Sequence, residues 1–198
     1  MPLLLDFQQD QFYPQLTLFN LVEISMNTKC ITALFLSLLS CSIFVNAHTK
    51  HTNITANIVE QVNADLPQAL TTLEQIVNIN SGTMNFTGVK QVGDVLSKEL
   101  DDLGFETQWI DGSAFNRSGH LVASYGTKGP KILMIGHLDT VFAKTDVFQK
   151  FQRLDENSIA GPGITDMKGG DVIIVATLRA LKKLGLLEQV SIKVIMTG

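Results

Sequence analysis

Two short segments of the chain carry side chains whose types and spacing suit chemistry. The first is Gly136-His137-Leu138-Asp139-Thr140, directly after the apolar run 131–135. Side chains alternate along a strand, so His137 and Asp139 face the same way if strand geometry continues. A histidine with a carboxylate two residues on suits metal binding, in which one group binds the ion and the other holds the free ring nitrogen. A plain hydrogen-bonded pair explains the same pattern.

The second segment is rich in glycine and runs from Gly161 to Gly170. Glycines ahead of a helix bring the backbone close to something at the carboxyl edge of a sheet, where open α/β sheets bind ligands. Phosphate-binding and dinucleotide-binding loops are disfavoured, because neither of their glycine spacings occurs here. Asp166 is the only carboxylate of the segment, and it suits either a metal ligand or a cap of the following helix.

The elements around these segments alternate between helices and strands. Apolar residues three and four apart predict helices over 65–77, 87–103 and from Gly169 or Gly170 to 184. Strands are predicted over 105–110, 120–125, 131–135 and 190–196, with 131–135 and 190–196 buried on both faces. The alternation predicts an α/β fold with a central, mostly parallel sheet between helices. The polar stretch 48–63 is expected to be an irregular lead-in.

The front of the chain has the pattern of an export signal. Met26–Lys29 is a short basic region, Cys30–Val45 is uncharged, and Val45-Asn46-Ala47 is a small-x-small cleavage site. We therefore expect a signal peptide over 26–47, export to the periplasm or the medium, and no stable membrane insertion after cleavage. A retained anchor is the alternative, although the apolar run of about 16 residues is short of the roughly 20 that span a membrane.

Residues 1–25 precede this signal and are interpreted as an extension upstream of the true start at Met26. The chain has 198 residues, with 15 Lys and Arg against 19 Asp and Glu, and 17% of its residues are charged. This acidic balance argues against a nucleic-acid partner. Both cysteines, Cys30 and Cys41, lie in the signal, so the mature chain is left with His, carboxylates, Ser, Thr or Lys for chemistry.

In combination, the two glycine-flanked segments are specific. The order of buried strand, His-x-Asp, Gly-Pro-Gly-x-x-Asp-x-Lys-Gly-Gly and helix resembles the M20 family of metallopeptidases, in particular its glutamate carboxypeptidase branch. The resemblance extends back to Val77–Thr83 and forward to Gly198. It implies the catalytic domain of a zinc exopeptidase, with residues 48–198 as its N-terminal part.

The resemblance implies two zinc ions. By that resemblance His137 binds one zinc, Asp166 bridges both, and Asp139 is the catalytic-site carboxylate that orients His137. It also implies a cis peptide bond between Asp166 and Met167. Imidazole and carboxylate ligands serve cobalt and manganese as well as zinc.

The implied reaction is hydrolysis of an amide bond near a free carboxylate, in a small peptide or an N-acyl amino acid. The family's general base belongs to a Glu-Glu pair that follows a strand ending in a Thr-Gly-Asp type sequence. Here the sequence reaches Met196-Thr197-Gly198 and no such pair is present. We therefore expect residues 1–198 to lack hydrolase activity and, because the strand 190–196 would have an unpaired edge, to be poorly soluble alone. The family's dimerisation domain also lies beyond Gly198, so a homodimer of the full-length protein stays open.

Three alternatives remain from the sequence. The first is an amino-acid deacylase of the same family, similar to acetylornithine deacetylase or succinyl-diaminopimelate desuccinylase. Those enzymes work in cytoplasmic biosynthesis, so the export signal favours a carboxypeptidase. The second is a non-catalytic binding module that retains the fold. The third is a nucleotide-binding protein, which the missing glycine spacings disfavour.

Overall fold

The computed structural model describes the backbone of residues 28–198 and the side chains from Asn53 onward. The chain divides into two units at the junction between His48 and Thr49. The predicted upstream extension, 1–25, lies outside the described residues, and the predicted signal 26–47 is described only as helical backbone from Thr28. Within the part that is described, no helix combines the length and the apolar character needed to cross a membrane.

Three helices are present where the apolar periodicity predicts them: α1 (Thr28–Val77), α2 (Phe86–Asp102) and α3 (Gly169–Lys183). The stripe of α2 is fully buried, at Val89, Val92, Leu96 and Leu100. Its first turn is capped by the Asn85 side chain, which accepts a hydrogen bond from the Gly88 N–H at 3.3 Å. The irregular lead-in predicted for 48–63 is wrong, because α1 continues through it and no glycine interrupts that stretch.

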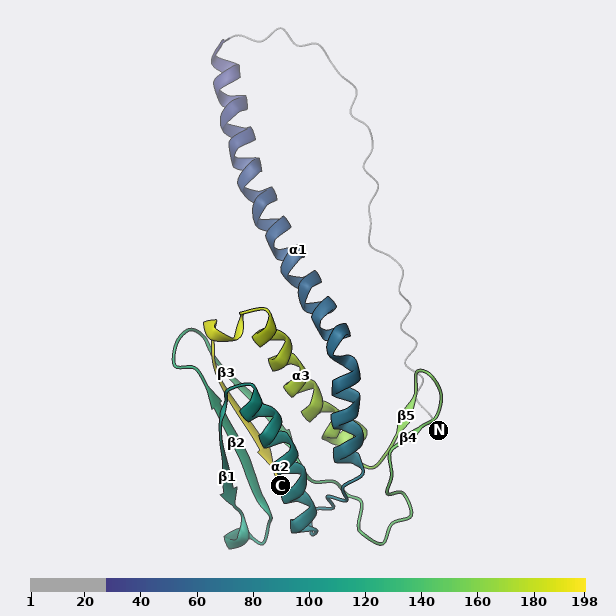
Figure 1. The fold of residues 1–198 in the computed structure, drawn as a ribbon. Helices are drawn as coiled ribbons and strands as arrows, with labels where there is room; N and C mark the ends of the chain where they lie inside the picture. Colours follow the sequence, from purple (N-terminus) through teal and green to yellow (C-terminus); the bar gives the residue numbers. More distant parts are fainter. Residues whose placement is uncertain (1–27) are drawn as a thin grey trace. The chain divides into compact units, whose positions relative to one another are not determined.

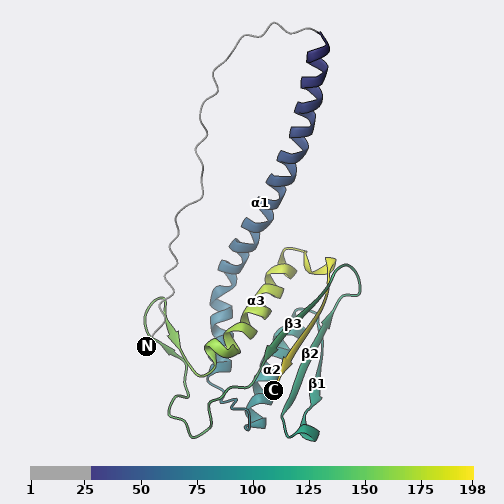
Figure 2. The same ribbon diagram turned by 180° about the vertical axis from the view of Figure 1, so that it is seen from behind.

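Four strands form the main sheet in the order β1-β2-β6-β3. They are β1 (Glu106–Asp111), β2 (Gly119–Tyr125), β3 (Lys131–His137) and β6 (Ser191–Thr197), each within two residues of its predicted bounds. Figures 1 and 2 show the sheet from its two sides. The pairs β1–β2 and β2–β6 are antiparallel, and β3–β6 is parallel from Lys131 opposite Ser191 to His137 opposite Thr197.

These pairings confirm the α/β class but correct two details. The sheet is mixed rather than mostly parallel, because the short connection between β1 and β2 only allows an antiparallel pair. The strand predicted at 190–196 does not have an unpaired edge. It becomes β6, an inner strand bonded to β2 on one side and β3 on the other, and the outer strands are β1 and β3.

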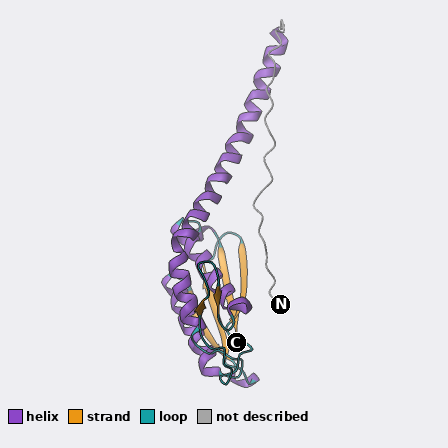
Figure 3. Ribbon diagram, turned by 90° about the vertical axis from the view of Figure 1, so that its right-hand side faces the viewer, coloured by secondary structure: helices purple, strands orange, loops and turns teal. Residues whose placement is uncertain are grey.

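The helices of the unit 49–198 cover one face of the sheet, as Figure 3 shows. The hydrophobic core lies between these helices and the sheet, and it contains residues of α1, α2, α3, β2 and β6. The prediction that β3 and β6 are buried on both faces is therefore wrong, because β6 alternates between buried and more exposed residues and most of β3 is exposed. On the open face Leu133 is 57% exposed and Ile135 is 63% exposed. This face of β3 therefore presents apolar side chains to solvent.

The connection from β3 to β6 carries the glycine-rich segment. It begins with a loop after His137, continues through a small antiparallel pair, β4 (Gln152–Arg153) with β5 (Ile159–Ala160), and then reaches Gly161. A helical turn over Ile164–Lys168 leads directly into α3. Parallel strands must be joined by a crossover, and here α3 forms it. The glycine-rich segment, which precedes α3, therefore lies at the edge of the sheet where β3 ends.

Two leucines on opposite faces of the sheet test whether the hydrophobic core lies on one face only. Leu121 of β2 is 1% exposed, and Leu133 of β3 is 57% exposed. Leu121→Ala is expected to lower the free energy of unfolding by about 2–5 kcal/mol, as buried Leu→Ala changes do. Leu133→Ala is expected to cost less than about 1 kcal/mol, because it leaves no cavity. Urea unfolding of residues 49–198 measures both, and an equal loss would contradict an open face.

Candidate functional site

The structure brings the two predicted segments together at the carboxyl end of β3. His137 is the last residue of β3, and Asp166 lies in the turn Ile164–Lys168 that precedes α3. His137 Nε2 is 2.8 Å from Asp166 Oδ1, although 29 residues separate them in the sequence. The Asp166 side chain is 82% exposed and that of His137 is 29% exposed. Both groups are therefore open to a ligand from solvent.

Asp139 holds the other side of the imidazole. His137 Nδ1 is 3.0 Å from the Asp139 backbone oxygen and 3.3 Å from its Oδ1. The second carboxylate oxygen of Asp139 accepts a hydrogen bond from the Thr83 hydroxyl. Asp139 therefore fixes the ring and leaves Nε2 directed at Asp166, which is the arrangement that orients a metal-binding histidine.

Sequence reasoning missed Thr83. It belongs to the loop between α1 and α2, and its N–H donates to the Thr140 oxygen at 3.0 Å, while the Thr140 N–H donates to Ser81 at 2.8 Å. These bonds join the loop to the segment after β3 as a short parallel bridge between Gly82 and Thr140. No local pattern around Thr83 signals a contact 56 residues away.

The charges around His137 favour its protonated form. Burial acts against the charged imidazolium, but the hydrogen bond with Asp166 and the charges of Asp139 and Asp166 outweigh it and raise the pKa of His137. An imidazole that faces two carboxylates is also a site that attracts a cation. A metal ion would replace the proton that these carboxylates otherwise stabilise.

Asp166 does not act as a helix cap, and its carboxylate is directed at His137. Its carboxylate contacts His137, and α3 begins after Lys168 without a side-chain hydrogen bond at its N-cap. The Asp166–Met167 peptide bond is cis, as the resemblance implies. The backbone of both residues departs from helical dihedral angles inside the turn. The alternative role as a cap is thus unsupported.

The glycines of the second segment serve close packing. Gly163 has a φ of 76°, and a Cβ atom there would lie 2.4 Å from the Thr140 Cγ2. A Cβ atom on Gly161 would lie 2.4 Å from the Val77 Cγ1 at the end of α1. Both contacts are too short for any side chain, so the glycines let the Asp166 turn approach α1 and the segment after β3.

Lys168 anchors the same turn from inside the core. Its side chain is fully buried, and its ammonium donates hydrogen bonds to the Ile76 oxygen at 2.8 Å and the Ile79 oxygen at 2.9 Å. These carbonyls stand at the end of α1, where the helix dipole is negative. Burial lowers the pKa of Lys168 to about 8, against the opposing charge of Asp171.

Asp171, in the first turn of α3, is buried against the end of β3. A Cβ atom on Gly136 would lie 2.1 Å from the Asp171 Oδ1, so only glycine fits next to His137. Neither oxygen of Asp171 has a hydrogen-bond partner among the described residues. Burial raises the pKa of Asp171 to about 8, although the proximity of His137 and Lys168 opposes the shift. The carboxyl group is therefore mostly protonated at neutral pH.

The donors at this edge fit part of a metal site. Imidazole nitrogen and carboxylate oxygen are ligands that zinc accepts, and the two donor atoms of His137 and Asp166 converge. Within the described residues no group of three or more His, Cys, Asp or Glu is placed to hold an ion. The described residues thus bring together one imidazole and two carboxylates, those of His137, Asp139 and Asp166.

Comparison of the sequence with known proteins finds a family and a relative. Residues 133–198 match the model of peptidase family M20/M25/M40. Carboxypeptidase G2 from Pseudomonas sp. (strain RS-16) is 33% identical over 141 residues, which cover 70% of this chain and 34% of that protein. The chain belongs to the M20 family. It spans about a third of the length of this relative.

Solved structures share the fold. Human carnosine dipeptidase 1 superposes with a TM-score of 0.64 at 19% identity, over 72% of this chain and 34% of that chain. The M20 family metallo-carboxypeptidase Sso-CP2 from Sulfolobus solfataricus gives 0.53 at 19% identity, over 66% and 30% of the two chains. At these identities the likeness concerns the fold of this M20 domain.

Replacement of the buried Lys168 tests whether its ammonium anchors the turn Ile164–Lys168 to α1. Lys168→Met keeps the length of the side chain but leaves the oxygens of Ile76 and Ile79 without their donor. We expect the free energy of unfolding to fall by about 1–3 kcal/mol for each unpaired carbonyl. The matched control is Lys182→Met, which removes an exposed lysine bond to the Asp102 oxygen and should cost under about 0.5 kcal/mol. Similar losses in urea unfolding would contradict the anchor.

The buried carboxyl group makes stability depend on pH. The pKa of Asp171 is about 8 in the folded chain against a usual 3.8, so folding takes up a proton between these values. Stability must therefore fall as pH rises from about 5 to 8, by at most roughly 1.4 kcal/mol per pH unit for this group. Asp171→Asn should flatten this slope in chelator-treated protein. The control Asp94→Asn, at an exposed position of α2, should keep it.

Proposed function

We propose that the protein hydrolyses the amide bond before a C-terminal, glutamate-type residue, using a metal-activated water. The observation that supports this most directly is the convergence of His137 Nε2 and Asp166 Oδ1 at the carboxyl end of β3. That edge is where α/β sheets bind their ligands. Membership in the M20 family and the 33% identity to carboxypeptidase G2 supply the reaction type.

In this proposal two zinc ions are the cofactor, with cobalt or manganese as possible substitutes. His137 would hold one ion through Nε2, and the exposed Asp166 carboxylate would bridge both. Asp139 and Thr83 would keep the imidazole in the tautomer that leaves Nε2 free. A bound zinc ion supplies the Lewis acidity that makes water nucleophilic near neutral pH.

The proton of the attacking water needs a general base. Residues 1–198 contain no Glu-Glu pair, which carries that base in the family. Asp139 is occupied by His137 and Thr83, and Asp171 is buried, so neither is free to take the proton. We infer that residues 1–198 alone do not turn over substrate.

The proposed substrates are small peptides or N-acyl amino acids with a free C-terminal carboxylate. The sequence of the leader supports export to the periplasm or the medium, where such an enzyme would act on external peptides. A homodimer of the full-length protein is part of the proposal, through surfaces outside this domain.

The decisive experiment uses the protein at its natural full length, loaded with zinc. It is offered Ala-Glu, N-acetyl-ornithine and N-succinyl-diaminopimelate, and release of free amine is measured. Fastest hydrolysis of Ala-Glu, lost with a chelator and restored by zinc, is the expected result. Preference for an N-acyl diamino acid would instead support a deacylase. Absence of turnover on all three would leave a binding module.

Loss of the orienting carboxylate gives a sharper test. Asp139→Asn keeps the size of the side chain but weakens its hold on His137, so zinc affinity and kcat/KM should each fall by about 10–100-fold. Zinc affinity is measured by competition with a chromophoric chelator, which requires no turnover. Asp94→Asn, far along α2, is the control and should match the wild type. Unchanged zinc affinity in Asp139→Asn would remove that residue from the site.

A further inference from the structure

A second histidine, His120, stands in the same row of the sheet as His137. The parallel pairing of β3 with β6 places His137 opposite Thr197. The antiparallel pairing of β2 with β6 ends with Leu121 opposite Met196, and the next residues along this register are His120 and Thr197. Neighbouring strands lie about 4.8 Å apart, so the Cα atoms of the two histidines are separated by two such spacings, roughly 10 Å.

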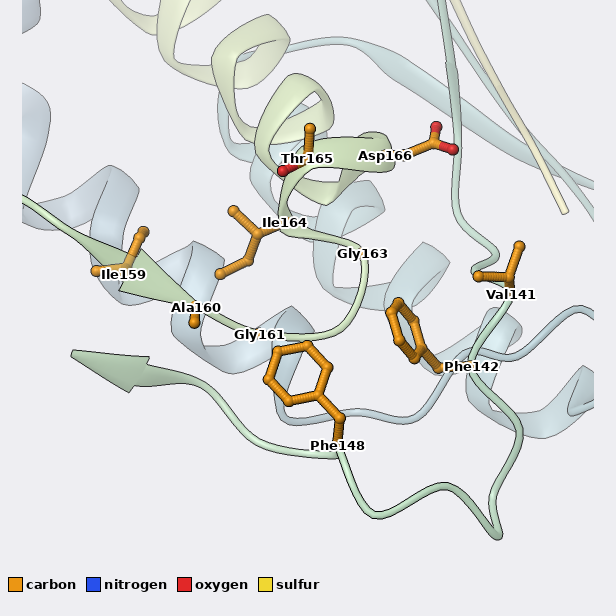
Figure 4. A pocket seen from close by; sticks show the side chains of 10 residues that line it. All are labelled: Val141, Phe142, Phe148, Ile159, Ala160, Gly161, Gly163, Ile164, Thr165 and Asp166. Carbon is orange, nitrogen blue, oxygen red and sulfur yellow. The ribbon is translucent and has the colours of Figure 1, made fainter. Parts of the chain in front are cut away.

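The end of β6 adjoins the edge of the sheet that carries the candidate site. Asp166 reaches this edge from the glycine-rich turn, and Figure 4 shows its carboxylate directed towards the chain that continues β3 to Val141. β6 is the neighbour of β3 within the sheet. The chain that follows Gly198 therefore starts beside the edge that His137 and Asp166 share.

Three contacts fix the end of β6. The Thr197 oxygen accepts a hydrogen bond from the N–H of Leu138, directly after β3, at 2.6 Å. The Gly198 N–H donates to the His120 Nδ1 at 3.4 Å. A Cβ atom on Gly198 would lie 2.4 Å from the Val89 Cγ1, so only glycine fits at this point. These contacts determine the direction in which the chain leaves the strand.

The bond from Gly198 selects one form of the His120 ring. Because Nδ1 accepts a hydrogen bond, it carries no proton of its own, and the neutral ring then carries its proton on Nε2. The side chain is half-buried, and this is its one hydrogen bond among the described residues. His120 is therefore the side chain of β2 that holds the end of β6.

We propose that His120 is a positioning residue for the general base of the reaction. This assignment rests on the proposed function, in which the base belongs to residues that follow Gly198 in the full-length protein. By accepting the Gly198 N–H, His120 holds the start of that segment, and through it the distance from the base to the attacking water. In this assignment His120 touches neither substrate nor metal. A catalytic group misplaced by about 1 Å can cost about 100-fold in rate, so a contact of this kind has a large effect.

The kinetic test uses zinc-loaded protein at its natural full length and the substrate Ala-Glu. His120→Phe keeps a planar ring but removes the acceptor, so kcat should fall by about 10–100-fold. KM and zinc affinity should stay at their wild-type values, because the variant leaves His137 and Asp166 intact. His120→Asn returns an acceptor oxygen close to the position of Nδ1 and should restore most of kcat. The matched control is Ser124→Ala, a half-buried position on the same strand and face, which should match the wild type.

A second measurement needs no turnover. The full-length protein is labelled with ¹⁵N-histidine, and long-range ¹H–¹⁵N NMR identifies the tautomer of the ring whose signals disappear in His120→Asn. We expect a proton on Nε2 and none on Nδ1. In ¹⁵N-glycine-labelled protein the Gly198 amide should exchange about fivefold faster in His120→Phe, the scale of one neutral hydrogen bond, and regain protection in His120→Asn.

The outcomes separate this inference from the proposed function. Unchanged kcat in His120→Phe, equal losses in His120→Phe and His120→Asn, or a ring protonated on Nδ1 would overturn the positioning role. If the bulk of phenylalanine lowers thermal stability, His120→Ala removes the acceptor without adding atoms and should show the same loss of kcat. A wild type that releases no amine from Ala-Glu, with the expected tautomer and exchange, would overturn the peptidase and leave the His120 contact standing.

Discussion

The parallel pairing of β3 with β6 is the constraint on which the site depends. Two parallel neighbours cannot be joined by a tight turn, so the chain must leave the carboxyl end of β3 and cross back over the sheet through α3. The Asp166 turn lies at the start of α3 and therefore returns to the edge where His137 ends its strand. Proximity between two residues 29 positions apart follows from this topology before any side-chain contact is considered.

Buried ionisable groups convert that proximity into a fixed geometry. The Lys168 ammonium donates a hydrogen bond to the Ile76 oxygen at the end of α1. The Asp171 carboxyl fills the space that Gly136 leaves beside His137. Removing an ammonium and a carboxyl from water is unfavourable, and burial moves the pKa of both towards neutrality. The two hydrogen bonds of Lys168 offset part of this cost, whereas Asp171 has no such bond among the described residues. The turn is thus held in place by groups that do not themselves face the ligand.

Local pattern predicted the elements and singled out His137, Asp139 and Asp166 as candidate site residues, but it did not predict what surrounds them. The stripe of α2 and the apolar runs of β3 and β6 were predictable because each is set by its own residues. The order of strands was not, since the insertion of β6 between β2 and β3 depends on pairing across more than fifty residues. For the same reason the pattern of β3 indicated burial on both faces, whereas Leu133 and Ile135 remain open. Thr83 and Asp171 act through contacts that no spacing in the sequence encodes.

The balance of charge at the edge favours a cation as the ligand of the pair. Asp139 and Asp166 flank one imidazole, and the buried Lys168 ammonium donates its hydrogen bonds to the carbonyls of Ile76 and Ile79 instead. Raising the pKa of Asp171 to about 8 removes a third negative charge at neutral pH, which limits repulsion but leaves two carboxylates against a single weak base. A proton on His137 offsets the charge of one carboxylate. A divalent ion bound through the same imidazole lone pair would offset the charge of both.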